Sequence, residues 1–160
     1  MDKKSLRADD LEVIKKYSDM VYRMAFSLLK NRYDAEDIHQ DVFVQYLKKR
    51  PKFENSEHER AWFLRVTVNL CRNFWKKAWR QREVGLVEEE LDGRTAAGAE
   101  ETEDEIIGLV KRLPRKYRIV IHLFYYEELS TEEIAKVLGM KPSTVRTQLT
   151  RAREKLKVLL

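Results

Sequence analysis

The 160-residue chain has room for one domain or two small ones, because compact domains span roughly 50 to 200 residues. Hydrophobic residues make up 43% and charged residues 37%, with only five glycines, which favours helices with a packed core and a solvated exterior. A single cysteine, Cys71, excludes an internal disulfide, and three scattered histidines add too few ligands for a structural zinc site. The net charge of +5 permits nucleic-acid binding but does not establish it.

Targeting and catalytic signals are missing from the sequence. No early apolar run resembles a signal peptide, and no stretch approaches the roughly 18 to 20 apolar residues of a membrane-spanning helix. We therefore expect a cytoplasmic protein without stable membrane insertion. No glycine-rich phosphate loop, nucleophile motif or clustered acid/base pair is found, so we expect neither an enzyme nor a cofactor or metal.

The first half of the chain predicts three helices. Apolar residues from Leu11 to Leu28 recur at spacings of three, four and seven, which is typical of one helical stripe. A second helix is expected after the break NRYD, with Asp34 as its N-cap and Pro51 as its stop. Ser56 and Glu59 form a capping-box pattern that begins a long third helix, in which aromatic and basic residues alternate.

Charge divides the chain into three blocks. Residues 60–82 contain seven basic residues and no acidic one, residues 83–105 contain ten acidic residues and one arginine, and the last twenty residues are basic again. The acidic block includes LDGRTAAGAEE, which has little to bury, so we interpret residues 83–101 as a flexible linker. The simplest interpretation of this run of like charge is a solvated, self-repelling tether that binds no partner. The expected fold is all-α, with two small helical domains, residues 1–82 and 102–160.

Two more helices are expected after the acidic block. Thr102 and Glu105 form a capping-box pattern, and apolar residues follow until Pro114, which cannot continue a helix but fits the first turn of the next. Residues from Tyr117 to Phe124 then supply the inner face of that next helix.

The segment LSTEEIAKVLGMKPSTVRTQLTRAREKL predicts a helix-turn-helix. Ser130 and Glu133 form a capping box, Gly139 ends the short helix, and Pro142 begins the last one. The second helix of such a motif enters the DNA major groove, where arginine pairs with guanine and glutamine with adenine. A merely solvated basic helix is the alternative. The candidate DNA contacts are Thr144, Arg146, Thr147, Gln148, Arg151 and Arg153.

Nearly the whole chain resembles one family. One similarity lies in the C-terminal stretch LPRKYRIVIHLFYYEELSTEEIAKVLGMKPSTVRTQLTRAREKL. It resembles the promoter-binding domain of bacterial sigma factors of the extracytoplasmic-function group, within the sigma-70 family. The core-polymerase-binding helix of that family resembles YDAEDIHQDVFVQYLKK, and its helix for recognising and opening the promoter resembles AWFLRVTVNLCRNFWKKAWR. Asp41 stands where the family often has glutamate, which shortens the carboxylate without removing it.

The resemblance implies a specificity subunit that binds core RNA polymerase and directs initiation through the −10 and −35 promoter elements. The first domain is implied to bind the clamp helices of the polymerase and the second its flap. An anti-sigma factor is a further implied partner. The implied polymerase contacts are Asp34, Glu36, Asp37, Gln40, Asp41 and Phe43, which repeat at helical spacings and form an acidic strip with an aromatic anchor.

The third helix is implied to capture the single non-template strand of the −10 element. Aromatic and basic interleaving suits unstacked bases and their phosphates, and the exposed members of Trp62, Phe63, Trp75 and Trp79 are expected to stack on bases. The implied −10 contacts are Arg65, Asn69, Arg72, Asn73, Lys76 and Arg80.

Two other function classes are compatible with parts of the chain. A repressor or activator would use only the helix-turn-helix, bind duplex DNA without polymerase and usually form a symmetric dimer. The acidic strip and the aromatic-basic helix argue against it, because a sensor domain needs neither. An RNA-binding or nucleic-acid-processing enzyme lacks clustered metal ligands or an acid/base pair.

Overall fold

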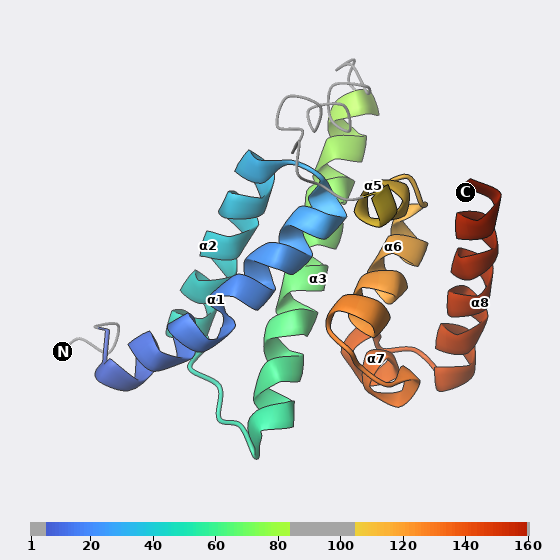
Figure 1. Ribbon diagram of the computed structural model, residues 1–160. Helices are drawn as coiled ribbons and strands as arrows, with labels where there is room; N and C mark the ends of the chain where they lie inside the picture. The colour runs from blue at the N-terminus through green and yellow to red at the C-terminus, as the bar shows by residue number, and fades with distance from the viewer. Residues whose placement is uncertain (1–5, 84–104, 160) are drawn as a thin grey trace.

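The computed structural model describes residues 6–83 and 105–159, and every regular element in those ranges is helical (Figure 1). No helix within them is long and apolar enough to cross a membrane. The expected linker, residues 83–101, lies outside the described residues except for Glu83. Thr102, the expected cap of the next helix, also lies outside them. The helices are α1 (Ala8–Leu29), α2 (Arg32–Lys49), α3 (Ser56–Glu83), α5 (Glu105–Lys111), α6 (Arg115–Ile121), the π-helical η2 (His122–Tyr126), α7 (Thr131–Leu138) and α8 (Pro142–Leu159).

Helices α1, α2 and α3 form the N-terminal half around the ring of Phe63, which is fully buried. Its centroid lies 4.6 Å from that of Tyr17 on α1 and 5.5 Å from those of both Phe43 and Tyr46 on α2. Such ring pairs add stability beyond the apolar area that they bury. One aromatic residue of α3 therefore ties the three helices together.

The helix starts in this half differ from the expected ones. Asn31, not Asp34, caps α2, and its Oδ1 accepts the Asp34 backbone N–H at 2.9 Å. Asn55 Oδ1 likewise accepts the His58 N–H at 2.8 Å, so Ser56 is the first residue of α3 rather than its cap. The predictions were wrong because asparagine, aspartate and serine cap about equally well. The position at which the backbone leaves the extended conformation decides between neighbouring candidates.

The C-terminal half confirms the expected motif. Ser130 Oγ accepts the Glu133 N–H at 3.1 Å, and the Glu133 carboxylate accepts the Ser130 N–H at 2.7 Å, so the capping box is complete. Gly139 ends α7 with φ of 69°, a left-handed conformation that favours glycine. Val145 and Leu149 on α8 are buried in the same apolar cluster as Ile134 and Ala135 of α7.

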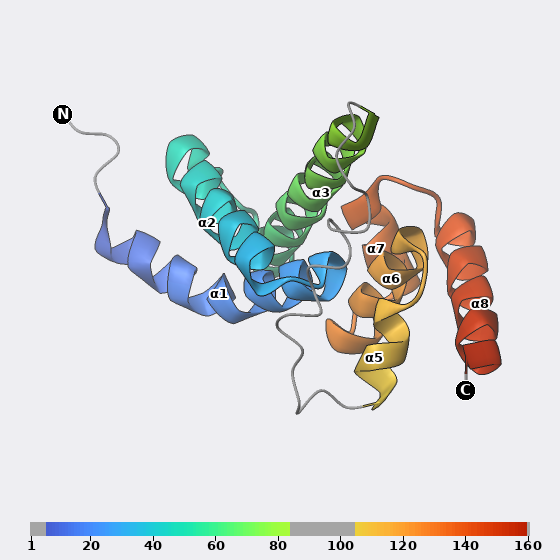
Figure 2. The same ribbon diagram turned by 90° about the horizontal axis from the view of Figure 1, so that it is seen from above.

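The two halves pack against each other and share one continuous apolar cluster. We call this interface the seam and define it as the contacts of α1 and α3 with α6, η2 and α7 (Figures 1 and 2). On the C-terminal side of the molecule, α8 lies far from α1 to α3 and packs on α5, α6 and α7 (Figure 2). The sequence predicted two domains but not that they meet.

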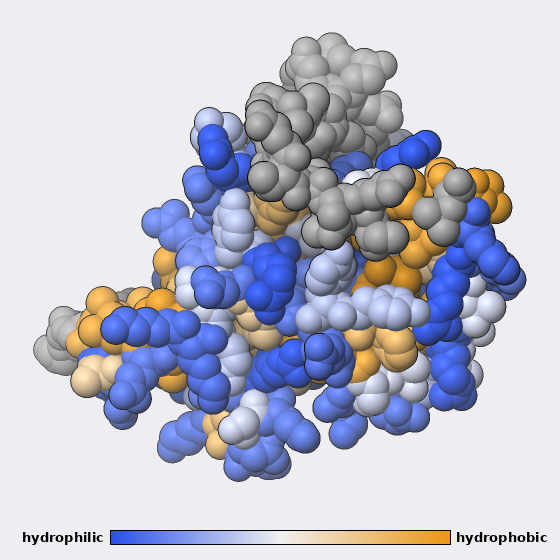
Figure 3. Space-filling model, in the orientation of Figure 1, coloured by the Kyte–Doolittle hydropathy of each residue, from blue (hydrophilic) through white to orange (hydrophobic). Residues whose placement is uncertain are grey.

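The surface is hydrophilic over most of the face in Figure 3. Apolar residues gather at its two ends, over the start of α1, where Leu6 and Leu11 are exposed, and beside the end of α8, where Val158 is exposed. Leu11 was expected in the apolar stripe of α1 but lies 48% exposed, because it is roughly 100° or more around the helix from the buried residues Asp10 and Tyr17.

Candidate nucleic-acid and polymerase interfaces

The polar face of α3 is one continuous stripe. At 3.6 residues per turn, the six residues of α3 that are implied to contact the −10 element fall within roughly 100° of the helix circumference. The opposite face is buried and includes Leu64, Cys71 and Ala78. Five of the six side chains are exposed and Arg72 is half-buried. The stripe consists of Arg65, Asn69, Arg72, Asn73, Lys76 and Arg80.

The aromatic residues of α3 divide between core and surface. Phe63 is 0% exposed and Trp75 is 9% exposed, so neither ring is available to a base in this arrangement. Trp62 is half-buried, and its ring packs edge-on against Phe63 at 4.9 Å. Trp79 is 55% exposed at the far end of the stripe. Exposed members of this set were expected to stack on bases, and Trp79 is the most exposed of the four rings.

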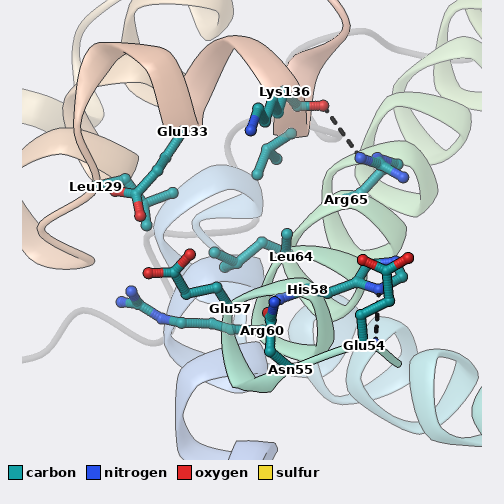
Figure 4. Close-up of a pocket in the computed structure, with 12 residues that line it drawn as sticks. Glu54, Asn55, Glu57, His58, Arg60, Leu64, Arg65, Leu129, Glu133 and Lys136 are labelled. Atoms are coloured by element: carbon teal, nitrogen blue, oxygen red, sulfur yellow. Dashed lines mark hydrogen bonds between the residues drawn. The ribbon is translucent and has the colours of Figure 1, made fainter. Parts of the chain in front are cut away.

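Two members of the α3 surface already contact the C-terminal half. Arg65 Nη2 donates to the carbonyl oxygen of Lys136 on α7 at 3.1 Å. The guanidinium of Arg115 on α6 lies 4.8 Å from the centroid of the Trp75 ring. Between α3 and α7 the seam leaves a groove of about 410 Å³, lined by charged residues of both helices over an apolar floor that includes Leu64 and Leu129 (Figure 4).

The acidic strip on α2 is narrower than expected. Asp34 is 5% exposed and Phe43 is 7% exposed, and the Phe43 ring contacts Phe63 and His39 in the core. In this arrangement neither side chain is exposed to a partner. The exposed members of the strip are Glu36, Asp37, Gln40 and Asp41.

Two apolar residues that the sequence reasoning missed border this strip. Tyr33 is 62% exposed and Val44 is 40% exposed. Eleven residues are close to three helical turns, so both lie on the same side of α2 as Asp37 and Gln40. That periodicity was available in the sequence and could have identified them. The strip therefore has apolar contacts at both ends instead of one aromatic anchor.

The outward face of α8 lies opposite its buried residues Val145, Leu149 and Ala152. Thr144 is exposed on one flank of that buried stripe, and Gln148 beside it is half-buried. The centre of the outward face includes Ser143 and Thr150, which were not predicted. A shallow depression there is lined by Ser143, Arg146, Thr147, Thr150, Arg151 and Glu154.

Arg153 on α8 is held in place by two aromatic residues of η2. Its Nε donates to the hydroxyl of Tyr125 at 2.8 Å, and its guanidinium carbon lies 5.4 Å from the Phe124 ring and 5.7 Å from the Tyr125 ring. Tyr125 is 51% exposed, and nothing in its sequence position indicated this role.

The described part of the chain offers nothing suited to metal binding. It contains no group of three or more histidine, cysteine, aspartate or glutamate side chains that could hold an ion. Burial raises the pKa of the Cys71 thiol well above its usual value, so this side chain stays protonated.

Comparison with known families gives two matches in the order of the two halves. The family model for sigma-70 region 2 matches residues 13–81, and the one for sigma-70 region 4 matches residues 103–156. The RNA polymerase sigma factor SigV of Bacillus subtilis is 30% identical over 141 residues, which cover 87% of this chain and 83% of SigV. The ECF RNA polymerase sigma factor SigW of the same organism is 29% identical over 160 residues, covering 91% and 86%.

Solved structures share the fold. The sigma factor RpoE from Bartonella quintana, solved in complex with the anti-sigma factor NepR, aligns with a TM-score of 0.69 at 20% identity, over 96% of this chain and 97% of RpoE. CnrH, solved in complex with the cytosolic domain of CnrY, aligns with a TM-score of 0.68 at 23% identity, over 98% of this chain and 90% of that one.

Proposed function

The chain belongs to the sigma-70 family, as a promoter-recognising sigma factor of the extracytoplasmic-function group, and we propose how its surfaces divide the work of transcription initiation. One observation carries the proposal. A single chain presents an acidic strip on α2, a polar and aromatic face on α3 and the outward face of a helix-turn-helix. A regulator that bound duplex DNA alone would need only the third surface.

Core polymerase binds the acidic strip. Glu36, Asp37 and Asp41 provide charges that steer the encounter with a basic partner, because complementary charge mainly raises the association rate. Tyr33 and Val44 add apolar area at the ends of the strip, where desolvated contacts contribute most of the binding energy. We assign this surface to the clamp helices and the C-terminal half to the flap.

The −10 element binds to α3 as a single strand. Arg72 and Lys76 follow the phosphates, while Asn69 and Asn73 offer amide groups to the edges of unpaired bases. Stacking on an aromatic side chain is worth roughly 1 to 3 kcal/mol per base, and Trp79 supplies an exposed ring. Binding energy of this kind favours the separated strand, so the protein assists promoter opening without chemical catalysis.

The −35 element binds to α8 as duplex DNA. The N-terminal turns of α8, with Arg146 and Thr147, enter the major groove, where arginine reads guanine through two hydrogen bonds. Ser143 and Thr150 lie on the same outward face and add short polar contacts. Arg153, held against Tyr125, contacts the phosphate backbone beside the groove.

Simultaneous binding of both elements requires the two halves to separate. Elements about 17 base pairs apart at 3.4 Å per pair lie roughly 58 Å from each other. A globule of 160 residues has a radius of gyration of about 15 Å and is therefore only about 40 Å across. We infer that the closed arrangement is a resting state and that the promoter complex is more extended. A chain of about 20 residues between the halves reaches at most roughly 70 Å, which is enough.

An anti-sigma factor is the other partner that we propose. RpoE and CnrH were each solved with a partner protein, and the RpoE partner is an anti-sigma factor. By analogy, such a partner would hold this chain inactive by covering its polymerase-binding surfaces. We place this regulation in the cytoplasm, where core polymerase works.

Transcription in vitro tests the function. Purified protein is added to core polymerase on a library of DNA fragments, and the RNA start sites are mapped. We expect starts at a fixed distance downstream of one shared pair of sequence elements. A library that yields no promoter-specific transcript overturns the proposal. Tight binding of a symmetric dimer to duplex DNA without polymerase would instead favour a repressor or activator.

A further inference from the structure

Glu127 of the C-terminal half lies at the centre of the seam with its side chain almost completely buried. The side chain is 1% exposed, and two arginines of the N-terminal half contact it. Arg23 on α1 binds it with two hydrogen bonds, Nε to Oε2 at 3.1 Å and Nη2 to Oε1 at 3.0 Å. Arg60 on α3 donates to the Glu127 carbonyl oxygen and lies 3.7 Å from Oε1. Paired hydrogen bonds between arginine and carboxylate are among the strongest and most directional in proteins.

The backbone before and after Glu127 is unusual in a way that turns this side chain inward. The preceding segment, η2, is a π-helical turn in which the Glu127 N–H bonds the His122 carbonyl oxygen at 3.1 Å. Glu128 follows with φ of 58°, a left-handed conformation that is unfavourable for a residue with a side chain. Irregularities of both kinds concentrate at functional sites. His122 Nε2 then lies 2.8 Å from Glu127 Oε2 and fixes the carboxylate from within its own half.

A purely internal role for Glu127 would require only His122. The additional contacts with Arg23 and Arg60 come from the other half, and they exist only while the halves are together. When the halves part, Glu127 retains the imidazole and loses both guanidinium groups. The carboxylate is therefore connected to both halves in the closed state and to one half in the open state.

The end of α1 is also completed from across the seam. No basic residue lies in the last turn of α1, so its partly negative carbonyl end is not balanced within the helix. Arg118 on α6 is 4% exposed, and its Nη2 donates to the Leu28 carbonyl oxygen at 2.8 Å. Its Nη1 donates to Leu113 within the same half at 2.8 Å. Charged hydrogen bonds, which water can replace, therefore contribute to the seam beside its apolar contacts. Interfaces of this character between domains usually separate readily.

We propose that Glu127 is the latch of a closed state in which the C-terminal half holds Arg65 of the −10 surface, and that release of Arg23 and Arg60 opens it. This proposal rests on the proposed function, because it assigns a regulatory role to the arrangement of the promoter-binding halves. The closed state occupies Arg65 and covers Trp75, both on the helix that we assign to the −10 element. Closing the latch therefore competes with DNA for the same helix.

Energy transfer between two dyes measures the latch without polymerase or DNA. Cysteines are introduced at Lys52 and Glu132, which are exposed on opposite halves, while the native Cys71 is buried and does not react with the dyes. We expect high transfer efficiency in the wild-type chain. Glu127→Gln and Arg23→Gln are each expected to raise the ratio of open to closed molecules by about ten-fold, because each removes a charged pair that is buried on one side. Unchanged efficiency in both variants overturns the proposal.

Two comparisons make this result specific. Lys16→Gln also removes a cation from α1, but Lys16 pairs with Glu59 at 3.4 Å inside the N-terminal half, so its transfer efficiency should equal that of the wild type. The double variant Glu127→Gln/Arg23→Gln should open no further than Glu127→Gln alone, since the loss of the Glu127 charge already removes the ion pair with Arg23. Independent, multiplying effects of the two changes would contradict the latch.

Failure of the latch and failure of the proposed function are distinguishable. Arg23 is half-exposed on the surface of α1, so Arg23→Gln still tests the latch if Glu127→Gln does not fold. If the closed state limits polymerase binding, Arg23→Gln should lower the half-saturating concentration of sigma factor in transcription by up to the same ten-fold. If Arg23→Gln opens but the wild type directs no promoter-specific transcription, the proposed function is rejected and the latch is supported. A variant that opens but needs the same concentration would reject the regulatory role.

Discussion

The two basic helices, α3 and α8, face their surroundings differently. Helix α8 lies at the edge of the molecule, with its buried stripe against α5, α6 and α7 and its outward face uncovered (Figure 2). Helix α3 runs through the middle, packed by α1 and α2 within its own half and by α7 across the seam. Its polar stripe is continuous, but Arg65 and Trp75 contact the C-terminal half.

This difference indicates an order of events. The outward face of α8 is supported within the C-terminal half, because α8 packs on α5, α6 and α7. On α3, Arg65 of the −10 surface is released from the Lys136 carbonyl oxygen only when the halves part. Duplex recognition is thus a property of one folded half, whereas strand capture depends on the arrangement of both. The following predictions test that distinction, from the largest expected effect to the smallest.

Replacing Leu149 by alanine should weaken the packing of α8 on the rest of the C-terminal half. This residue is 2% exposed, and Leu149→Ala is expected to lower the free energy of unfolding by about 2 to 5 kcal/mol through a cavity in the core. Urea denaturation measures the effect. Thr150→Ala, one residue further on the exposed face, should change stability by less than about 0.5 kcal/mol. Equal losses in the two variants would show that α8 is not seated as described.

Acid should weaken the seam through Glu127. Burial by itself raises the pKa of this carboxyl, but hydrogen bonds from His122 and Arg23 outweigh it and lower the pKa from 4.5 to about 2. A lowered pKa contributes stability that is complete above pH 4.5 and is lost as pH falls toward 2. The loss is about 3 kcal/mol in total, by the usual conversion of pKa shifts. Urea denaturation from pH 5 to pH 2 should show this loss of unfolding free energy in the wild type and in the control Glu12→Gln. The loss should be absent in Glu127→Gln.

Removing the exposed Trp79 ring of α3 should weaken binding of the single strand. Trp79→Ala is expected to cost roughly 1 to 3 kcal/mol in binding of the holoenzyme to a single-stranded non-template oligonucleotide, because one stacking contact is lost. Trp79→Phe retains a ring and should recover most of the affinity. Duplex binding through the −35 element should not change in either variant. A loss in duplex binding of the same size would mean that Trp79 acts through the fold.

Arginines on α8 should separate into base-reading and backbone-binding groups. Arg146→Ala is expected to relax preference at one or two base pairs of the −35 element by about 1 to 2 kcal/mol. Arg153→Ala should instead weaken holoenzyme binding to all −35 sequences alike and flatten its dependence on salt. Competition binding against single-base variants of the element distinguishes the two. If Arg146→Ala lowered affinity equally for every sequence, the base-reading face would have been misassigned.

The smallest effect concerns the support of Arg153. Tyr125→Phe removes the hydroxyl that accepts the Arg153 Nε–H but keeps the ring, so we expect a loss of only about 0.5 kcal/mol in binding to any −35 sequence. Tyr125→Ala also removes the ring contact and should lose more. The measurement is the same competition assay. A larger loss in Tyr125→Phe than in Arg153→Ala would show that the hydroxyl itself contacts DNA.

The sequence predicted the local features of the helix-turn-helix accurately, and it was less accurate for α2 and α3. The capping box at Ser130, the turn at Gly139 and the start at Pro142 follow from contacts within a few residues, so spacing alone identifies them. Phe43 was assigned to a binding surface by resemblance to the family, and Trp75 was a candidate for stacking only if exposed, but both side chains are buried. Which of these side chains lies inside depends on the angles at which neighbouring helices approach. Spacing along one helix does not contain that information.

The sequence by itself determined that this protein is helical, that its charge is separated into blocks and that its last two helices form a DNA-binding motif. Periodicity, capping and turn residues are local, and they act through contacts a few residues apart. Only the tertiary structure decided that the two halves meet, that Glu127 is buried between two arginines of the other half and that Tyr125 positions Arg153. Arg23 and Glu127 are 104 residues apart in the chain. No local preference brings two such groups together, and it is the packing of complete helices that does so.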